Sequence, residues 1–379
     1  GGGGGGGGNP PPTPVAVASI TLPADNGIAF VGAAKSIPAV VKGADGSTLT
    51  DRTVSWTSSN TAIATVGATG APGSATGVAE GTAVLTATVE GKSATMTVYV
   101  RKTPTDLAGY KALFPFVAPS DSFVVASDIS QAYSDARLDQ LLKSWNFFQG
   151  FFPKQPGGWA EMYYTWDSAI VSSQGGTACP SAALADLEGR LLRTCYEAGT
   201  TTNSFLVAPD LDAATGVVSI DNATALATVS QSFMDAITAS DSYKWPWLWE
   251  GLSTAFRSGD FANGPYTMRA LTDPERTAFK QAQTAGTLLT LPDLVALTRD
   301  RGTPPTGTWF AQETIAEPQA SVLLNYLFIN NQTVVKDLFA AIDAGTVTSS
   351  ADAFAFVLTG IGKTADQLDT AYKAYGASL

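Results

Sequence analysis

The sequence contains no histidine among its 379 residues. Imidazole is the usual general base of serine and cysteine hydrolases and the commonest metal ligand, so its absence excludes Ser-His, Cys-His and His-metal mechanisms within the chain. Charged residues are also scarce, at 15%. The net charge of −11 argues against a nucleic-acid partner. No apolar run reaches the length of a membrane span, so we expect no transmembrane segment.

Cysteine is nearly absent as well, because Cys179 and Cys195 are the only two. In an exported protein a pair this close in sequence forms a disulfide most often, and two free thiols are the alternative. Two cysteines without histidine and without a CxxC spacing do not make a metal site. We therefore expect no metal and no cofactor.

The first 14 residues read GGGGGGGGNPPPTP and cannot bury a core. One interpretation is a remnant of expression. The other is a tether, since the stretch resembles the mature start of bacterial lipoproteins, where a Gly-rich segment follows a lipidated cysteine. That resemblance implies export to the bacterial cell surface or periplasm, with membrane contact only through a lipid anchor. The anchor cysteine is not in this chain.

Charge divides the rest of the chain into two domains. Residues 1–101 hold five basic and five acidic residues, so residues 102–379 carry the whole net charge of −11. Tryptophan follows the same division, because only Trp56 precedes residue 102 and seven others follow it. We expect a β-sandwich at 15–101, a linker at 102–105 (KTPT) and a second domain at 106–379.

Residues 15–101 alternate apolar and polar residues in short segments separated by Gly, Asp and Asn, which predicts a β-sandwich. The stretch VSWTSSNTAIATVGATG and the segment after it resemble bacterial immunoglobulin-like domains of group 2. The matching residues are Trp56, Ser58, Ser59, Asn60, Ile63, Ala64, Val66, Gly77, Gly81 and Val98. The resemblance implies a spacer or adhesive module on an exported protein, with Trp56 packed in the core.

Residues 106–379 predict an α+β domain with a mixed part at 106–222 and a helical part at 223–379. Strands are expected at 122–128 and 160–167 and in the segments NSFLVAPD and GVVSID. Helices are expected at 135–152, 183–199, 223–239, 247–257, 274–285, 291–300, 314–331, 332–344, 350–359 and 364–375.

The helical part resembles gluzincin-type metallopeptidases. In that family one helix carries HExxH and a second helix supplies a glutamate ligand within a phrase such as Pro-x-Trp-Leu-x-Glu-Gly-Leu. Trp247, Leu248, Glu250, Gly251 and Leu252 match the phrase in spacing, and Pro246 stands directly before the tryptophan, one position closer than in the phrase. The resemblance implies that Glu250 occupies the position of the third zinc ligand.

The first half of that site departs from the family pattern. Ser230 and Met234 stand where the two histidines belong, and Gln231 stands where the catalytic glutamate belongs. Hydroxyl and thioether groups are poor zinc ligands, and an amide is no general base. The resemblance therefore implies a pseudo-metallopeptidase without metal. The alternative is an ordinary amphipathic helix whose Phe233 and Met234 are core residues, with Glu250 a surface carboxylate.

Four aromatic residues gather just before Glu250, at Tyr243, Trp245, Trp247 and Trp249. Rings at alternate positions of an extended segment lie on one side, as a ligand platform for a sugar or peptide requires. The alternative is that they pack the start of a helix. A glycosidase pair would draw its carboxylates from Glu161, Asp167, Glu313 and Glu317, but no spacing selects two of them.

These observations favour a non-catalytic exported surface protein with a structural, adhesive or assembly role, in contact with other envelope or surface proteins. The first alternative is a carbohydrate-active hydrolase that uses Glu250 with a second carboxylate beside the tryptophans. The second is a lipoprotein that binds glycans or peptides in the same cleft.

Overall fold

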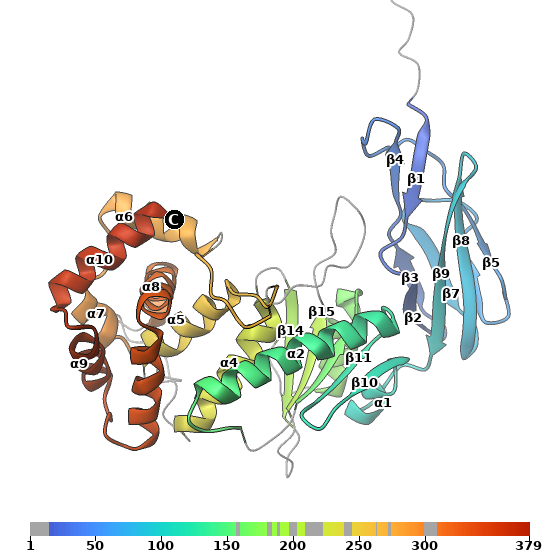
Figure 1. Ribbon diagram of the computed structural model, residues 1–379. Helices are drawn as coiled ribbons and strands as arrows, with labels where there is room; N and C mark the ends of the chain where they lie inside the picture. Colours follow the sequence, from blue (N-terminus) through green and yellow to red (C-terminus); the bar gives the residue numbers. More distant parts are fainter. Residues whose placement is uncertain are drawn as a thin grey trace, which may run out of the picture.

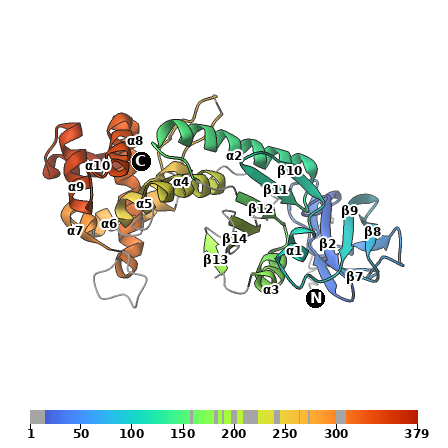
Figure 2. The ribbon, with the colours of Figure 1, turned by 90° about the horizontal axis from the view of Figure 1, so that it is seen from below.

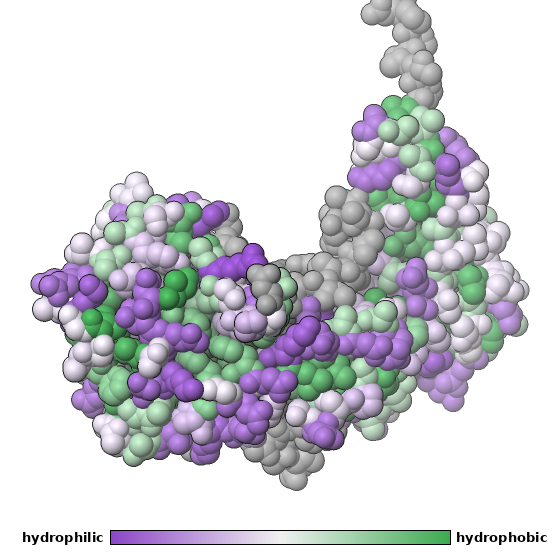
Figure 3. Space-filling view, in the orientation of Figure 1, coloured by the Kyte–Doolittle hydropathy of each residue, from purple (hydrophilic) through white to green (hydrophobic). Residues whose placement is uncertain are grey.

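In a computed structural model the chain is described over residues 15–156, 160–179, 184–187, 190–196, 203–208, 223–238, 245–262, 264–271, 274–298 and 309–379. The described parts form three successive regions: an all-β domain, a mixed sheet with its helices, and a helical region (Figure 1). The all-β domain and the helical region lie at opposite ends, with the mixed sheet between them (Figures 1 and 2). In the space-filling view the upper outline of the molecule dips between these two ends (Figure 3).

The β-domain contains nine strands, two or three more than the six or seven segments that alternate in the sequence. They are β1 (Val17–Thr21), β2 (Asn26–Phe30), β3 (Ala34–Ile37), β4 (Val40–Gly43), β5 (Ser55–Ser58), β6 (Ala64–Val66), β7 (Gly73–Gly77), β8 (Gly81–Val89) and β9 (Lys92–Arg101). The largest sheet has the order β2-β9-β8-β5, a second has β3-β7-β6, and β1 pairs with β4. The prediction of an all-β N-terminal domain is confirmed, whereas its membership of the immunoglobulin-like family stays a prediction.

Two features show how the sequence builds this domain. Strands β8 and β9 are joined by Glu90 and Gly91, both at positive φ, which is the geometry of a two-residue hairpin turn of type I′. Trp56 is 4% exposed and donates from Nε1 to the carbonyl oxygen of Gly70 at 2.8 Å. Its ring lies against Gly73, where a Cβ atom would clash with the indole. Trp56 is therefore a core residue, as predicted.

The middle region begins with α1 (Leu107–Lys111), six residues after the end of β9. Its other elements are β10 (Phe116–Pro119), β11 (Phe123–Ser127), α2 (Gln131–Phe151), β12 (Ala160–Tyr164), η1 (Ile170–Gln174), α3 (Gly175–Ala178), β13 (Leu184–Leu187), β14 (Arg190–Tyr196) and β15 (Asn203–Ala208). The sheet order is β10-β11-β12-β15-β14-β13, and β11, β12 and β15 run parallel to one another. Helix α2 packs against β10 and β11 (Figure 1).

The prediction of a helix at 183–199 is wrong. Strands β13 and β14 form an antiparallel hairpin there, with Leu187 opposite Arg190. The apolar residues of LADLEGRLLRTCY also fit a helical period, which is why the pattern was ambiguous. Pairing of β14 with β15 supplies the tertiary contact that local periodicity does not encode.

The helical region follows the predicted series closely. Its helices are α4 (Ala223–Thr238), α5 (Pro246–Arg257), α6 (Glu275–Ala285), α7 (Leu291–Ala296), α8 (Trp309–Asp343), α9 (Ser350–Ile361) and α10 (Ala365–Ser378). Helix α8 contains one non-helical residue, Asn331, at φ −146° and ψ 44°. That break falls where the sequence predicts the boundary between two helices. The order of an all-β domain and a mainly helical part is confirmed, and likeness to gluzincins stays a prediction.

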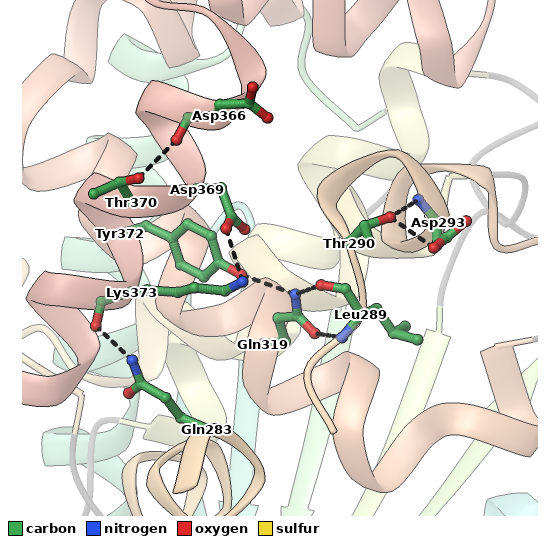
Figure 4. A network of polar contacts seen from close by, with 10 residues as sticks. All are labelled: Gln283, Leu289, Thr290, Asp293, Gln319, Asp366, Asp369, Thr370, Tyr372 and Lys373. Atoms are coloured by element: carbon green, nitrogen blue, oxygen red, sulfur yellow. Dashed lines mark hydrogen bonds and ion pairs between the residues drawn. The ribbon is translucent and has the colours of Figure 1, made fainter. Parts of the chain in front are cut away.

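The core of the helical region combines stacked aromatic rings with a few buried polar groups. Phe152 lies between Phe233 of α4 and Phe339 of α8, at ring distances of 5.9 Å and 4.8 Å. Gln319 of α8 is fully buried and exchanges two hydrogen bonds with the backbone of Leu289 (Figure 4). Its amide also donates to the hydroxyl of Tyr372, so this one side chain joins α8, the segment before α7, and α10.

Several predictions fall on residues beyond the described ranges, namely the tether at 1–14, the strand GVVSID and Tyr243. Cys179 is buried and is not a free thiol, but the side chain of Cys195 is outside the described residues, so the Cys179–Cys195 disulfide stays a prediction. Among the described residues, no helix has the length and apolar character of a membrane span.

Candidate functional site

Two parallel strands of the mixed sheet end side by side, and each is followed by an aspartate. Asp128 comes directly after β11, and Asp167 comes three residues after the end of β12. Because parallel strands present their carboxyl ends at one edge, these residues meet where open α/β sheets usually bind ligands. The sequence thus builds a polar edge at this end of the sheet.

The β-domain covers this polar edge. Asn26, at the start of β2, donates from Nδ2 to the carbonyl oxygen of Ile129 at 2.8 Å. The indole Nε1 of Trp166 donates to the carbonyl oxygen of Asn26 at 2.9 Å. Gly27 follows, and a Cβ atom there would lie 2.8 Å from the same indole nitrogen. The close approach of the two domains therefore depends on glycine at this position.

Lys35 of β3 reaches across the junction to Asp167. Its Nζ lies 2.5 Å from Oδ2 of Asp167, and the lysine side chain is only 6% exposed. The ammonium also lies 4.3 Å from the ring centroid of Trp166, which is a cation–π contact. A lysine buried to this degree needs such partners, because an isolated buried charge costs several kcal/mol.

Asp128 is the most deeply buried carboxyl of the junction, with no exposed surface. Its Oδ2 accepts a hydrogen bond from the Thr165 hydroxyl at 2.9 Å. Burial raises the pKa of Asp128 to about 7, although the charge of Lys35 and the Thr165 hydrogen bond oppose that rise and the charge of Asp167 adds to it. At neutral pH Asp128 is therefore divided between its acid and its carboxylate.

A pocket of about 300 Å³ opens beside the ion pair. It lies between β2 and β3 of the β-domain and the segment around η1 of the mixed-sheet region. Lys35, Asp167, Ser36, Ser173 and Gln174 supply its polar groups, and the remaining lining is largely apolar. The junction thus combines a buried ion pair, a buried acid with a raised pKa and an accessible space, which are features typical of functional sites.

The residues predicted from the peptidase resemblance lie elsewhere. Helices α4 and α5 pack against each other, and Ser230 and Met234 on α4 are fully buried. Glu250 on α5 is half-buried. For Gln231 only the position on α4 is described. Phe233 is also fully buried, within the aromatic core. Whether this helix pair derives from a zinc site stays a prediction.

The tryptophans near Glu250 pack rather than form an open platform. Trp247 is fully buried and donates from Nε1 to the Ser350 hydroxyl at 2.9 Å. Trp249 is 7% exposed and contacts Trp245 and Phe339. The interpretation of these rings as a ligand platform is therefore corrected: Trp247 and Trp249 are buried and have no ring face open to a ligand.

The carboxylates weighed as a glycosidase pair have separate surroundings. Glu161 pairs with Lys111 at 2.6 Å, and Asp167 pairs with Lys35. Glu317 accepts a hydrogen bond from Thr254 at 3.2 Å, and Glu313 is half-buried on the same helix. Glu161 and Asp167, the two carboxylates of the mixed-sheet region, therefore each form an ion pair with a lysine.

Comparisons with known proteins add little to this description. No family model matches the chain, and no curated protein matches it. Solved structures of the S-layer protein SbsC align with part of it. Domains 4 and 5 are 23% identical over 23% of this chain, with a TM-score of 0.21, and domains 5–6 are 19% identical over 29%, with a TM-score of 0.22. The alignments cover 53% of each of those two chains. Scores this low do not define a shared fold.

Sequence reasoning missed the junction because its residues are far apart in the chain. Lys35 and Asp167 are separated by 132 positions. A signal was nevertheless present: an aspartate follows each of two apolar strand segments, in SFVVASD and AEMYYTWD. Had the two strands been recognised as parallel neighbours, their aspartates would have been placed at one edge.

Proposed function

We propose that the chain is an exported surface protein with a structural, adhesive or assembly role. In this proposal the β-domain is an immunoglobulin-like spacer, and the rest of the chain is a pseudo-metallopeptidase domain without catalytic capacity. The observation that carries the proposal is the junction, where Asn26 bonds to both Ile129 and Trp166 and where Lys35 pairs with Asp167. Directional buried contacts of this kind fix the orientation of two domains better than a linker alone does.

Two further observations support a role without catalysis. The chain has no histidine, so the peptidase-like helices lack the side chains that would bind zinc. Ser230 and Met234, at the positions of the two zinc ligands in the resemblance, are buried in the helical core. Burial of both side chains supports a domain that does not present them to a metal or a substrate.

The location in the proposal depends on the Gly-rich start of the chain. A tether that joins a lipid anchor to a spacer would hold the larger domain away from the membrane, where envelope proteins, glycans or peptides are its partners. The low content of basic residues agrees with partners that are not polyanions.

The proposal is tested on the purified full chain with two measurements. Elemental analysis is expected to find no stoichiometric zinc, and peptide substrates are expected to remain intact. Small-angle X-ray scattering is expected to give one fixed distance between the β-domain and the helical region. The double variant Asn26→Ala, Lys35→Ala should broaden that distance distribution, while Asn330→Ala, whose side chain bonds only within α8, should not.

Two outcomes would contradict the proposal. Stoichiometric zinc with hydrolysis that disappears in Glu250→Gln would identify an active enzyme. A distance distribution as broad in the native chain as in the double variant would show that the junction does not fix the spacer.

A further inference from the structure

The Lys35–Asp167 pair differs from an ordinary surface ion pair in its surroundings. Lys35 is 6% exposed and Asp167 is 22% exposed, whereas Lys373 and Asp369 of α10 each keep 30% exposure. The pair on α10 lies within one helix, one turn apart, while Lys35 and Asp167 belong to two different domains. The buried pair is therefore held in contact by the packing of two domains and not by local helix geometry.

The groups around this pair fix its geometry. The Trp166 ring centroid lies 4.3 Å from the ammonium, and the lysine side chain is only 6% exposed. In a medium of low dielectric constant, an ammonium and a carboxylate lose much of their solvation. Transfer of one proton from nitrogen to oxygen then converts the ion pair into an amine beside a carboxylic acid.

We propose that Lys35 and Asp167 condense to an amide, which is an isopeptide cross-link between the β-domain and the mixed-sheet region. After the proton transfer, Nζ of Lys35 attacks Cγ of Asp167 and a C–N bond forms. One C–O bond of the carboxyl then breaks, and its hydroxyl leaves with a proton from the nitrogen as water. No atom is oxidised or reduced, and no further reactant is required.

Asp128 acts as a positioning residue for this reaction. The Thr165 hydroxyl donates to Asp128 and accepts from the backbone N–H of Asp167 at 3.2 Å, so one side chain links the two aspartates. Asp167 is oriented further by the N–H of Ala169, which donates to its Oδ1 at 3.0 Å. This leaves Oδ2 directed at Lys35.

The protonation of Asp128 also affects Lys35. Because burial raises the pKa of Asp128 to about 7, part of the molecules hold a neutral acid there at neutral pH. A neutral Asp128 adds no second negative charge beside the ammonium, so one fewer anion opposes the proton transfer. The adjoining pocket of about 300 Å³ gives the released water a way out.

The cross-link is tested by intact-mass measurement of the full chain after reduction of any disulfide. The expected mass is that of the sequence minus one water, and a proteolytic digest should contain one branched peptide that includes Lys35 and Asp167. Lys35→Ala and Asp167→Ala should each restore the full sequence mass. Lys373→Ala, which removes the half-buried lysine of the α10 ion pair, should keep the loss of one water.

The role of Asp128 is tested by the rate of the reaction. Chain purified in the unfolded state, before condensation, is refolded and sampled by mass over time. Asp128→Ala, which removes the acceptor for Thr165, is expected to slow condensation at least about tenfold, whereas Asp128→Asn, which keeps the acceptor and stays neutral, should react at least as fast as the native chain at pH 7. The native rate should fall as pH rises above 7, and the rate of Asp128→Asn should not follow that profile. An Asp128→Ala variant that reacts at the native rate would overturn this role.

The native chain alone decides the main proposal, whatever the variants do. A folded native chain with the full sequence mass and no branched peptide would overturn the cross-link. The proposal is independent of the suggested role in the envelope, because the mass measurement does not depend on catalysis, zinc or location.

Discussion

At the scale of single residues, Gln319 shows how one buried amide can organise several elements. Its side-chain amide forms hydrogen bonds with both the N–H and the C=O of Leu289 and is fully buried (Figure 4). The hydroxyl of Tyr372 contributes the third contact. A buried polar side chain of this kind stabilises a fold only while every partner is satisfied, since the penalty falls on the groups left unpaired.

Replacement of Gln319 by leucine is therefore expected to lower the free energy of unfolding by about 3 kcal/mol, because two part-buried backbone groups and one buried hydroxyl each lose a hydrogen bond. Gln283→Leu is the matched control, since Gln283 is half-buried and makes one bond to Lys373. It should cost less than about 1 kcal/mol. Urea denaturation measures both, and equal losses would contradict the interpretation.

Asp128 predicts a dependence of stability on pH. The pKa of its carboxyl is 3.8 ordinarily and about 7 in the folded chain. Between these values the folded state holds a proton that the unfolded state has lost, so the stability from this group is fully present below about pH 4 and is lost as pH rises through 7. The loss amounts to as much as roughly 4 kcal/mol.

This pH dependence is measured by thermal unfolding between about pH 4 and pH 8. The melting temperature of the native chain is expected to fall relative to that of Asp128→Asn across this window. The amide keeps an acceptor for Thr165 but does not titrate, so it isolates the carboxyl from all other groups. Parallel curves for the two proteins would show that Asp128 titrates normally.

At the scale of elements, the accuracy of the sequence predictions follows the range of the interactions that decide each element. The break in α8 was placed correctly because the polar segment around Asn331 interrupts an apolar helical pattern locally. Residues 183–199 were predicted wrongly as a helix because β14 is a strand through its pairing with β15. Local patterns indicate amphipathic helices well, but a strand also depends on a partner distant in the chain.

The motif that suggested a peptidase also contains a glycine with a packing role. A Cβ atom on Gly251 would lie 2.9 Å from the backbone carbonyl group of Ala320, where α5 and α8 cross. The backbone of a long helix does not shift cheaply. Gly251 therefore allows two helices to approach closely, irrespective of the ancestry of the motif.

Gly251→Ala is expected to destabilise the chain by about 1–3 kcal/mol through overpacking at this crossing. Gly150→Ala on α2 is the control, because a Cβ atom there meets no other atom within 4 Å. Alanine should be neutral or stabilising at Gly150, by up to about 1 kcal/mol. Chemical denaturation compares the two variants, and a neutral Gly251→Ala would mean that the helices can separate freely.

At the scale of the whole molecule, the sequence predicted the arrangement of regions better than the site. The charge and tryptophan content change near residue 101, and the last strand of the β-domain ends at Arg101. The junction could not be predicted in the same way. Lys35 and Asp128 have ordinary neighbours in sequence, and their special environment arises only when β3 covers the ends of β11 and β12.

The junction predicts that the β-domain and the rest of the chain unfold together. Asn26→Ala removes a bond to Ile129 but leaves the strands of the β-domain intact, so it should weaken the coupling with little local damage. Differential scanning calorimetry is expected to show one transition for the native chain and two for the variant. Asn330→Ala should keep one transition, and two transitions in the native chain would contradict the prediction.

The glycine at position 27 has a consequence for any exchange of the β-domain. A Cβ atom there would clash with Met96 of the β-domain and with the indole of Trp166, and Asn26 beside it donates to Ile129 and accepts from Trp166. A different β-module placed at this position would lack this fit. Transplanting the β-domain onto another protein would therefore require moving the residues that it contacts beside the mixed sheet along with it.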